Sequence, residues 1–342
     1  MKQSTTRIGI DLAKNTFQVC AVDKLGRTQF NKSVSRAKLP AVIAQMPESE
    51  VIMEACAGAH YWARVFERAG HSIKLIHPAY ARPFVQTNKN DAADALALCE
   101  AASRPNMRYV AGKTIDQQDI QSLHRIRDRL ISQRTALSNQ IRGLLGEYGV
   151  VLPQGIRAIR RLMPSVLEDA TNELSYRSRL SFQFLYEELL ALEERVTQIT
   201  RDVEKISRDT ERCQQWESIP GIGPMIATAM YATMGDPNNY RNGREFSAFL
   251  GLVPKQYSTG GKTILRGISK RGNAHTRRLL IQGAQAALRV MPRRNDALSR
   301  WACKLKASKG HCVAVVALAN KLARICWATA QHNMTYQPNY AQ

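Results

Sequence analysis

Hydrophobic and polar positions alternate along the first hundred residues in a way that predicts strands interleaved with helices. Three β-prone runs joined by Asp, Lys and Gly turns, at residues 7–12, 17–22 and 28–34, predict an antiparallel meander. Two later apolar strands, 51–55 and 73–76, alternate with helical patterns at 60–69 and 92–102. Three hairpin-connected strands followed by alternating helices and strands are typical of an α/β layer fold of the ribonuclease-H type.

The pattern then changes to long polar helices with apolar positions at helical spacing. One such run covers residues 114–148 and a second covers residues 176–213. Between them, residues 149–163 contain Pro153 and Gly155, which together break a helix. We interpret the two runs as an antiparallel helical hairpin or coiled-coil arm between domains. Two helices of an ordinary bundle remain the alternative, because spacing alone does not reveal the partner.

A third unit is expected from Trp216 to about residue 330. The predicted domains are therefore an α/β domain at 1–112, a helical arm at 113–214, a basic and mainly α domain at 215–330, and a polar tail at 331–342. The start, residues 1–6, lacks the apolar core of a signal peptide, so we expect a cytosolic protein. The longest apolar stretches near the C-terminus, such as residues 313–319, fall far short of the roughly 20 residues of a membrane span.

Composition adds a strong bias toward a polyanionic partner. The formal net charge is +21, which is unusual for an enzyme of small metabolites and indicates nucleic acid or another anionic surface. Residues 255–330 hold 16 Lys and Arg against the single acid Asp296, so most of the excess lies in one C-terminal unit. The seven cysteines are scattered and form no CxxC pair, which argues against a disulfide framework and a zinc site.

Four acidic residues in the first hundred stand where acids are costly or paired. Asp11 follows the apolar residues 8–10, and Glu54 ends the apolar run 51–53. Asp91 and Asp94 lie three apart at a helix start, so both carboxylates project from one face. Together the four offer hard oxygen ligands to one or two Mg²⁺ ions, with Mn²⁺ as an alternative.

Each acid also has an ordinary structural reading. The helix macrodipole could by itself favour Asp91 and Asp94 at the helix N-terminus, because it stabilises negative charge there. Asp11 could be a turn residue, and Glu54 a salt-bridged surface acid. The joint pattern is more specific than any of its members.

The C-terminal unit contains two glycine-rich segments of interest. Gly221 and Gly223 lie in a tight turn before a helical run at 225–234, and such turns let backbone N–H groups approach phosphates, as in helix-hairpin-helix modules. A plain helix N-terminus is the alternative. Farther on, Ser258 and Thr259 precede two glycines in what we expect to be a flexible loop near several cations, where a hydroxyl could attack a phosphodiester. An ordinary surface turn has the same composition.

Cationic side chains surround these segments and predict a nucleic-acid backbone footprint. A solvated helical face would explain any one pair, but not sixteen cations against one acid. Three histidines could assist proton transfer, although packed or surface positions explain each of them equally: His60, His77 and His275. The expected backbone contacts are Lys255, Lys262, Arg266, Lys270, Arg271, Arg277 and Arg278, with Arg293, Arg294, Lys304, Lys306 and Lys309 completing the surface.

These segments resemble a known family over nearly the whole chain. Residues 8–14, 53–55 and 90–95 look like the DEDD signature of the Piv-invertase-like transposases, the insertion sequence 110 family. The resemblance implies a RuvC-like N-terminal domain, with the four acids on Asp11, Glu54, Asp91 and Asp94. Residues 251–273 are similar to the C-terminal transposase domain of that family, whose serine attacks DNA and forms a covalent phosphoseryl link. Their spelling looks like the 1111 subgroup.

The position of the nucleophile stays open at this point. Counting back from Gly260 without a gap places Thr259 where relatives outside the subgroup have Ser. Residue chemistry favours Ser258, because a primary hydroxyl is less hindered than a secondary one. We therefore prefer Ser258 and keep Thr259 as the alternative.

The resemblance also implies partners that the residues alone do not reveal. It implies a site-specific DNA recombinase of an insertion sequence in the bacterial cytosol or nucleoid, acting on donor and target DNA as a homodimer or homotetramer. In that family a non-coding RNA from the element pairs with both DNAs, so base pairing reads the sequence, as in other guided systems. The expected partners are therefore DNA, RNA and further copies of this protein, and no membrane partner is expected.

Three other functions remain in view. A RuvC-like junction resolvase or nuclease would cut by water attack and would need the acids but neither hydroxyl. An actin-like ATPase also opens with a strand like residues 8–11, but no Walker A loop is present and the basic unit would be unexplained. A purely structural DNA-binding protein would need the basic unit but not the acids.

Overall fold

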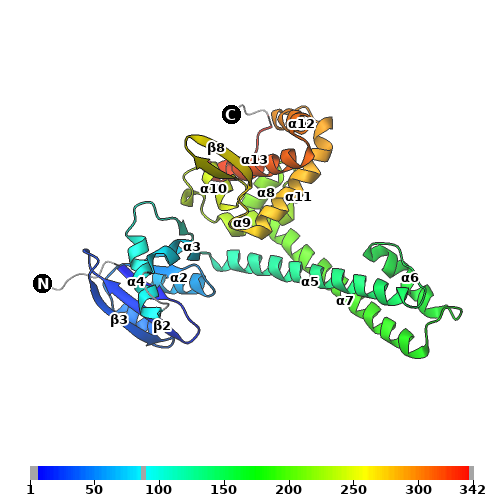
Figure 1. The fold of residues 1–342 in the computed structure, drawn as a ribbon, viewed down its shortest axis with the longest axis horizontal. Coiled ribbons are helices and arrows are strands. Elements are labelled where there is room, and N and C mark those ends of the chain that lie inside the picture. Colours follow the sequence, from blue (N-terminus) through cyan, green and yellow to red (C-terminus); the bar gives the residue numbers. More distant parts are fainter. Residues whose placement is uncertain (1–6, 86–89, 339–342) are drawn as a thin grey trace. The chain divides into compact units, whose positions relative to one another are not determined.

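The computed structural model describes residues 7–85 and 90–338. Residues 1–6, on which the expectation of no signal peptide rests, and residues 339–342 of the expected tail lie outside the described part. The chain divides into two compact units, Met1–Ile115 and Asp116–Gln342, which are described separately (Figure 1).

The first unit is built on a six-stranded mixed sheet in the order β3-β2-β1-β4-β5-β6. β1, β2 and β3 form the antiparallel meander, while β4 and β5 continue the sheet parallel to β1. This arrangement confirms a mixed α/β domain and is compatible with the expected ribonuclease-H-like fold. β6 adds a short antiparallel edge that the sequence pattern did not predict. The strands are β1 (Arg7–Asp11), β2 (Thr16–Val22), β3 (Thr28–Ser35), β4 (Glu50–Glu54), β5 (Ser72–Ile76) and β6 (Tyr109–Val110).

The two faces of this sheet are covered by different helices. Alternate residues of β1, Ile8 and Ile10, pack with Trp62 and Phe66 of α2 in one core. On the opposite face, Ile52 of β4 packs near Leu98 of α4. A strand with apolar residues on both faces is buried on both sides, which explains its nearly continuous apolar sequence. The described helices are α1 (Leu39–Ala44), α2 (Ala59–Arg68), α3 (Pro78–Ala81), the 3-10 turn η1 (Arg82–Phe84) and α4 (Asp91–Ala102).

The second unit begins with three helices that share a core. α5 (Ile115–Gly146) and α7 (Tyr176–Asp209) confirm the two long helices, and their apolar residues pack together with Ile159 and Met163 of α6 (Ile156–Glu168). The sequence reading of 149–163 as a break was wrong for its second half, because Pro153 and Gly155 precede α6 instead of preventing it. The coiled coil expected between the two long helices is not confirmed.

The second long run also ends earlier than expected. α7 stops at Asp209, Thr210 adopts an extended conformation, and a separate helix α8 (Glu211–Glu217) follows. The apolar spacing continues across this break, so periodicity alone read the two helices as one. Cys213 and Trp216 of α8 are buried in the C-terminal core and not in that of the long helices.

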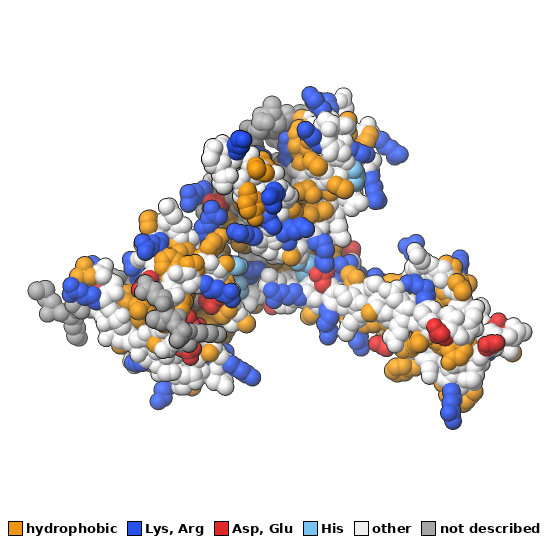
Figure 2. All heavy atoms as spheres, viewed as in Figure 1, with side chains coloured by type: hydrophobic (Ala, Val, Ile, Leu, Met, Phe, Trp, Pro, Cys, Tyr) orange, Lys and Arg blue, Asp and Glu red, His pale blue; other side chains and the backbone are white. Residues whose placement is uncertain are grey.

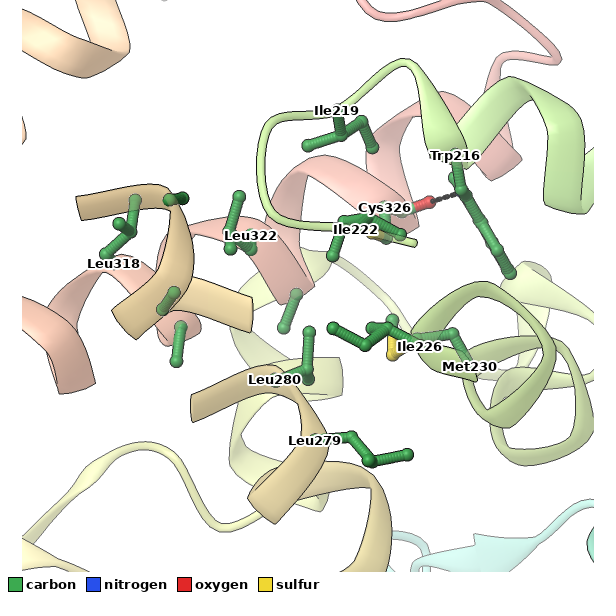
Figure 3. Packing of buried hydrophobic residues seen from close by; sticks show 14 of the residues in the cluster. Trp216, Ile219, Ile222, Ile226, Met230, Leu279, Leu280, Leu318, Leu322 and Cys326 are labelled. Atoms are coloured by element: carbon green, nitrogen blue, oxygen red, sulfur yellow. Dashed lines mark hydrogen bonds between the residues drawn. The ribbon is translucent and has the colours of Figure 1, made fainter. Parts of the chain in front are cut away.

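The remaining helices pack around one large apolar core, which confirms a mainly α C-terminal part. Figure 3 shows Trp216 with its indole N–H directed at the carbonyl of Cys326, 2.9 Å away; Thr329 Oγ1 is a second acceptor at 3.1 Å. Ile226, Leu280 and Leu318 come from three different helices into this core. The elements are α9 (Pro224–Met234), η2 (Pro237–Asn239), α10 (Gly243–Phe249), α11 (Ala274–Val290), η3 (Met291–Arg293), α12 (Ala297–Lys309) and α13 (His311–Gln331).

By length and composition alone, α13 among the described helices is apolar enough to cross a membrane. Its apolar residues have another explanation, since Leu318, Leu322 and Cys326 are fully buried in the C-terminal core. A core helix of a folded unit passes the same test, so this is weak support for a span.

A two-stranded hairpin projects its side chains into solvent between α10 and α11. β7 (Pro254–Thr259) and β8 (Lys262–Ile268) pair antiparallel around the turn Gly260-Gly261. Both glycines have positive φ, +54° and +79°, which residues with a Cβ adopt poorly. The expectation of a flexible loop at Ser258 and Thr259 was therefore wrong, since both residues lie in a paired strand.

Candidate functional site

The ends of two neighbouring strands place Asp11 and Glu54 on the same edge of the first unit's sheet. β1 and β4 are parallel, with Gly9 opposite Ile52 and Ile10 opposite Met53. Side chains two residues apart point to the same face of a strand, so Asp11 shares the face of Gly9 and Glu54 shares the face of Ile52. Both acids are half-buried, and both belong to the face that α4 covers.

The close approach of α4 to β1 brings the other two acids to this edge. A Cβ added at Gly9 would lie 2.1 Å from the carbonyl oxygen of Ala95 and 2.8 Å from Cys99 Sγ. Only glycine leaves room for the helix at this crossing. The first turn of α4, which leads directly into Ala95, carries Asp91 and Asp94.

Three of the four predicted acids form a cluster that fits a divalent cation. One carboxylate oxygen each from Asp11, Asp91 and Asp94 lies within 4.8 Å of the other two. Asp11 and Asp94 are half-buried and Asp91 is exposed. Like charges at this spacing repel unless a cation or proton lies among them, and hard oxygen donors suit Mg²⁺ or Mn²⁺. Glu54 is not in this group of three.

The negative charges of Glu54 and Asp11 nevertheless act on a common neighbour, the Cys56 thiol. Burial, and then the negative charges of Glu54 and Asp11, raise the pKa of the Cys56 thiol. Cys56 lies two residues after the end of β4, and its backbone N–H donates to the Glu54 carbonyl at 2.8 Å. Glu54 and Asp11 therefore both contribute negative charge around Cys56.

A hydrogen-bonded chain that the sequence reading missed ties the meander to the start of α4. Gln18 Nε2 donates to Asn31 Oδ1 at 2.7 Å, and Asn31 Nδ2 donates to the carbonyl of Ala92 at 2.8 Å. Gln18 lies opposite Asp11 in the β1–β2 register. The chain therefore fixes the turn of α4 that bears Asp91 and Asp94 against the strands beside Asp11. No sequence signal identifies it, because Gln and Asn in strands are common surface residues.

In the second unit, the hairpin separates the two candidate hydroxyls onto opposite faces. Ser258 pairs with Thr263, and its Oγ accepts a hydrogen bond from Gln256 Nε2 at 2.7 Å. Thr259 pairs with Lys262. Both hydroxyl residues are exposed.

The cations of the hairpin gather mainly on the face of Thr259. Alternation places Tyr257, Thr259, Lys262 and Arg266 on one face, where the Arg266 guanidinium lies 4.6 Å from the centre of the Tyr257 ring. Lys255 is exposed at the base of β7. Thr259 therefore shares its face of the hairpin with Lys262 and Arg266, whereas Ser258 lies on the opposite face.

The two glycines of the predicted phosphate turn differ in their surroundings. Gly221 has φ +89°, and a Cβ there would lie 2.6 Å from the carbonyl oxygen of Gly283 in α11. Packing against α11 thus accounts for this glycine by itself. Gly223 caps α9, and a Cβ there would meet nothing within 4 Å, so packing does not require glycine at this position.

Several predicted nucleic-acid contacts already have protein partners. Arg277 Nη1 donates to the carbonyls of Leu250 and Arg271, at 2.9 and 3.2 Å, and so holds the loop before α11. Arg278 Nη2 lies 2.6 Å from Asp128 Oδ2. Lys270, with φ +55°, lies in that same loop. Arg277 and Arg278 therefore contribute positive charge while also fixing local structure.

The histidines have structural partners too. His77 caps α3, with Nδ1 accepting from Ala79 N–H at 3.2 Å, and His60 lies in α2. His275 Nδ1 lies 2.7 Å from Asp128 Oδ2, and its ring packs edge-on against His124. The sequence reading did not single out His124 or Asp128, which bring α5 to α11.

Comparison with known proteins agrees with this organisation. A family model described as the transposase IS116/IS110/IS902 family matches residues 213–299. A second model, for DEDD transposases of the IS110 type, matches residues 8–150.

Three relatives illustrate how far the similarity extends. The chain is 43% identical to the transposase for insertion sequence element IS1111A of Coxiella burnetii, over 96% of this chain and 91% of that protein. It is 44% identical to a probable family 20 transposase of Pseudomonas aeruginosa, over 97% of this chain and 99% of that protein. It is 42% identical to the transposase for IS1328 of Yersinia enterocolitica, again over 97% and 99%.

Proposed function

The chain belongs to the IS116/IS110/IS902 family of transposases, enzymes that cleave and join DNA, and we propose that it is the site-specific recombinase of an insertion sequence, acting by metal-assisted serine attack. The observation that carries this proposal is the cluster of Asp11, Asp91 and Asp94 at one edge of the sheet. A DNA-binding protein without catalysis would have no use for three carboxylates in mutual repulsion.

The acids would hold Mg²⁺, or Mn²⁺, and the ion would supply Lewis-acid chemistry to a DNA phosphate. Asp11, Asp91 and Asp94 form the nearest oxygen donors, and Glu54 completes the set from the neighbouring strand end. A divalent cation held there would orient the attacking oxygen and stabilise charge on the phosphoryl group. Gln18 and Asn31 would keep α4 in register, so that the carboxylates stay together.

The covalent step falls to the hairpin of the second unit. Ser258 Oγ loses its proton to water and bonds to phosphorus, while the bond from phosphorus to one deoxyribose oxygen breaks and that oxygen gains a proton. The bond from Gln256 Nε2 occupies an Oγ lone pair and would orient the hydroxyl. Rejoining reverses the exchange with a new DNA end. Thr259 is the alternative, supported by its place beside Lys262.

The proposed division of labour follows the three predicted domains. Residues 1–112 supply the carboxylates, 113–214 form the arm, and 215–330 supply the hydroxyl and most DNA contacts. Backbone contacts fall to Gly221, Gly223, Lys255, Lys262, Arg266, Lys270 and Arg271, with Arg277 and Arg278 adding positive potential.

The proposed oligomeric state, guide RNA and cellular location of the protein are based on its family resemblance. We propose that a homodimer or homotetramer in the bacterial cytosol brings the acids of one protomer to the hydroxyl of another, and that an element-encoded RNA selects donor and target DNA. Purification at low salt should retain an RNA of defined length. Its absence would remove the guided scheme without affecting the catalytic one.

Variants at the acids test the catalytic proposal. Asp11→Asn and Glu54→Gln should abolish Mg²⁺-dependent cleavage of element-end DNA, because each removes a charge that holds the cation. Glu48→Gln, an exposed acid of the same unit, is the control and should keep full activity. Cleavage that persists in Asp11→Asn and Glu54→Gln would contradict the site.

Variants at the hydroxyls separate serine attack from water attack. Labelled DNA should form a protein adduct that survives denaturation, and Ser258→Ala should abolish it while Thr259→Ala retains it. The reverse result would move the nucleophile to Thr259. Cleavage without any adduct in the parent, retained in the double alanine variant, would instead identify a RuvC-like nuclease.

A further inference from the structure

A groove between η3 and α12 forms a second cationic site, apart from the hairpin and the phosphate turn. Its volume is about 570 Å³. Pro292 and Ala307 provide exposed apolar lining over the buried Met291, and Arg294, Arg300 and Lys306 provide the charge. Lys and Arg side chains gather over this part of the second unit, with hydrophobic side chains between them (Figure 2).

The charged groups of the groove keep donors available for a ligand. Arg294 uses Nε for Asp296 Oδ2 at 3.0 Å, which leaves its two terminal nitrogens. Arg300 uses Nη1 for the carbonyl and side chain of Asn295, at 2.7 and 3.1 Å. Within residues 7–85 and 90–338, Lys306 has no hydrogen-bond acceptor or acidic partner. Arg300 and Lys306 are six residues apart on α12, about 9 Å along the helix axis.

Asp296, the nearby acid, offsets one of these charges through its ion pair with Arg294 but is not itself exposed in the groove. One of its oxygens accepts from the Ser299 N–H, and the other accepts from Ser299 Oγ and Arg294 Nε. Burial alone would raise the pKa of Asp296, but these hydrogen bonds outweigh it and hold the pKa below its ordinary value. The carboxylate is itself buried. The groove thus exposes three cationic side chains and no acidic one, with a net charge of +2 once the Arg294–Asp296 pair is counted as neutral.

From this combination we infer that the groove binds an unpaired stretch of DNA, one that is separated from its complement during recombination. The inference rests on the proposed function for its DNA substrate. Cations at this spacing along a helix suit successive phosphates, while an apolar floor suits a base. In a duplex the bases are stacked inward, so a duplex would use the cations and leave the apolar floor empty. Guanidinium planes such as those of Arg294 and Arg300 also stack on exposed bases.

A cysteine in the lining of the groove allows ligand binding to be followed by alkylation of its thiol. Cys303 lines it and is half-buried, whereas Cys312 at the start of α13 is exposed and does not line it. Alkylation of the full chain by N-ethylmaleimide, followed cysteine by cysteine with mass spectrometry, should slow about tenfold at Cys303 when oligo(dT) of 20 nucleotides is added. Cys312 should react at an unchanged rate.

Matched oligonucleotides decide between ligands in the same assay. A DNA duplex that protects Cys303 as well as oligo(dT) does, or an RNA strand that protects it at lower concentration, would overturn the inference. Equal alkylation rates with and without oligo(dT) would do the same. All arms are run in EDTA, so that the result does not depend on catalysis.

Paired substitutions provide the second measurement. Arg300→Gln with Lys306→Gln should weaken oligo(dT) binding about tenfold by fluorescence anisotropy. Arg201→Gln with Lys205→Gln removes the same charge from exposed positions of α7, which are not among the predicted nucleic-acid contacts, and should weaken binding less than about threefold. Equal losses in the two pairs would show that only net charge matters. Loss of groove binding with intact Mg²⁺-dependent cleavage separates this site from the proposed active site.

Discussion

Acidification should destabilise the second unit through one buried histidine. His124 on α5 is 3% exposed, and its Nε2 lies 3.0 Å from Thr228 Oγ1 on α9. Thr228 Oγ1 also lies 2.7 Å from the carbonyl of Pro224 and donates to it. The bond to His124 is therefore donated by Nε2–H, which the neutral ring can supply. Burial first, and then the positive charges of His275 and Arg127, lower the pKa of His124 to about 4.

The direction and size of the effect follow from linkage. The unfolded chain binds a proton on this residue with a pKa of 6.5, whereas the folded chain does so only near 4. The stability that the neutral His124 contributes is therefore complete above pH 6.5 and is lost as the pH falls toward 4. At about 1.4 kcal/mol per pKa unit, the whole loss is roughly 3 kcal/mol, with about 2 kcal/mol already lost at pH 5.

Urea unfolding of the second unit measures this loss. In a Trp62→Phe background, the remaining tryptophans Trp216, Trp301 and Trp327 all lie in that unit. His124→Gln keeps a side-chain N–H for Thr228 but does not titrate. Between pH 7.5 and 5, the free energy of unfolding of the parent should fall by about 2 kcal/mol more than that of His124→Gln.

An exposed histidine supplies the control for this measurement. His332→Gln should follow the parent at every pH. Parallel stability curves for the parent and His124→Gln would refute the buried, neutral histidine. A difference of the opposite sign would mean that the folded state binds the proton more tightly than the unfolded one.

Three substitutions test the packing that positions the sites. Gly9→Ala places a methyl group 2.1 Å from the Ala95 carbonyl oxygen and should lower the free energy of unfolding in urea by about 3 kcal/mol. Gly143→Ala, which has open space around its Cβ, is the control and should leave that free energy unchanged or raise it by up to about 1 kcal/mol. Trp216→Phe loses the indole hydrogen bonds within the apolar core and should cost about 1–3 kcal/mol; an unchanged urea midpoint would contradict that. Asp296→Ala removes the N-cap of α12 and should cost about 1–2 kcal/mol, and amide exchange in the first turn of α12 would report it.

Within the first unit, local patterning determined most of the fold. The strands at 7–12, 17–22, 28–34, 51–55 and 73–76 are all present, because apolar runs between turn residues specify strands without knowledge of their partners. Asp11 and Glu54 could be identified in the same way, since an acid at the end of a buried strand is unexpected. Their shared face depended on the parallel register of β1 and β4, which no local pattern encodes.

Errors arose where local signals are ambiguous. Periodicity continued across Thr210 and merged α7 with α8. Pro153 and Gly155 concealed α6, whose apolar face is buried by the preceding and following helices, α5 and α7. Ser-Thr-Gly-Gly indicated a loop, because polar residues before glycines are frequent in loops. The pairing of β7 with β8 made it a hairpin and placed Ser258 and Thr259 on opposite faces.

The sequence by itself determined the acids, the uneven charge and the family, because these depend on residue identity and spacing. Only the tertiary structure decided which groups meet. Gly9 lets α4 approach β1, and Gln18 and Asn31 fix the helix there, so that Asp91 and Asp94 reach Asp11 from eighty residues away. The sequence alone also revealed no partners for Arg277 and Arg278. In the folded unit, Leu250 and Arg271 accept hydrogen bonds from Arg277, and Asp128 accepts one from Arg278. Contacts between distant segments depend on how the chain packs, and packing is a property of the whole unit.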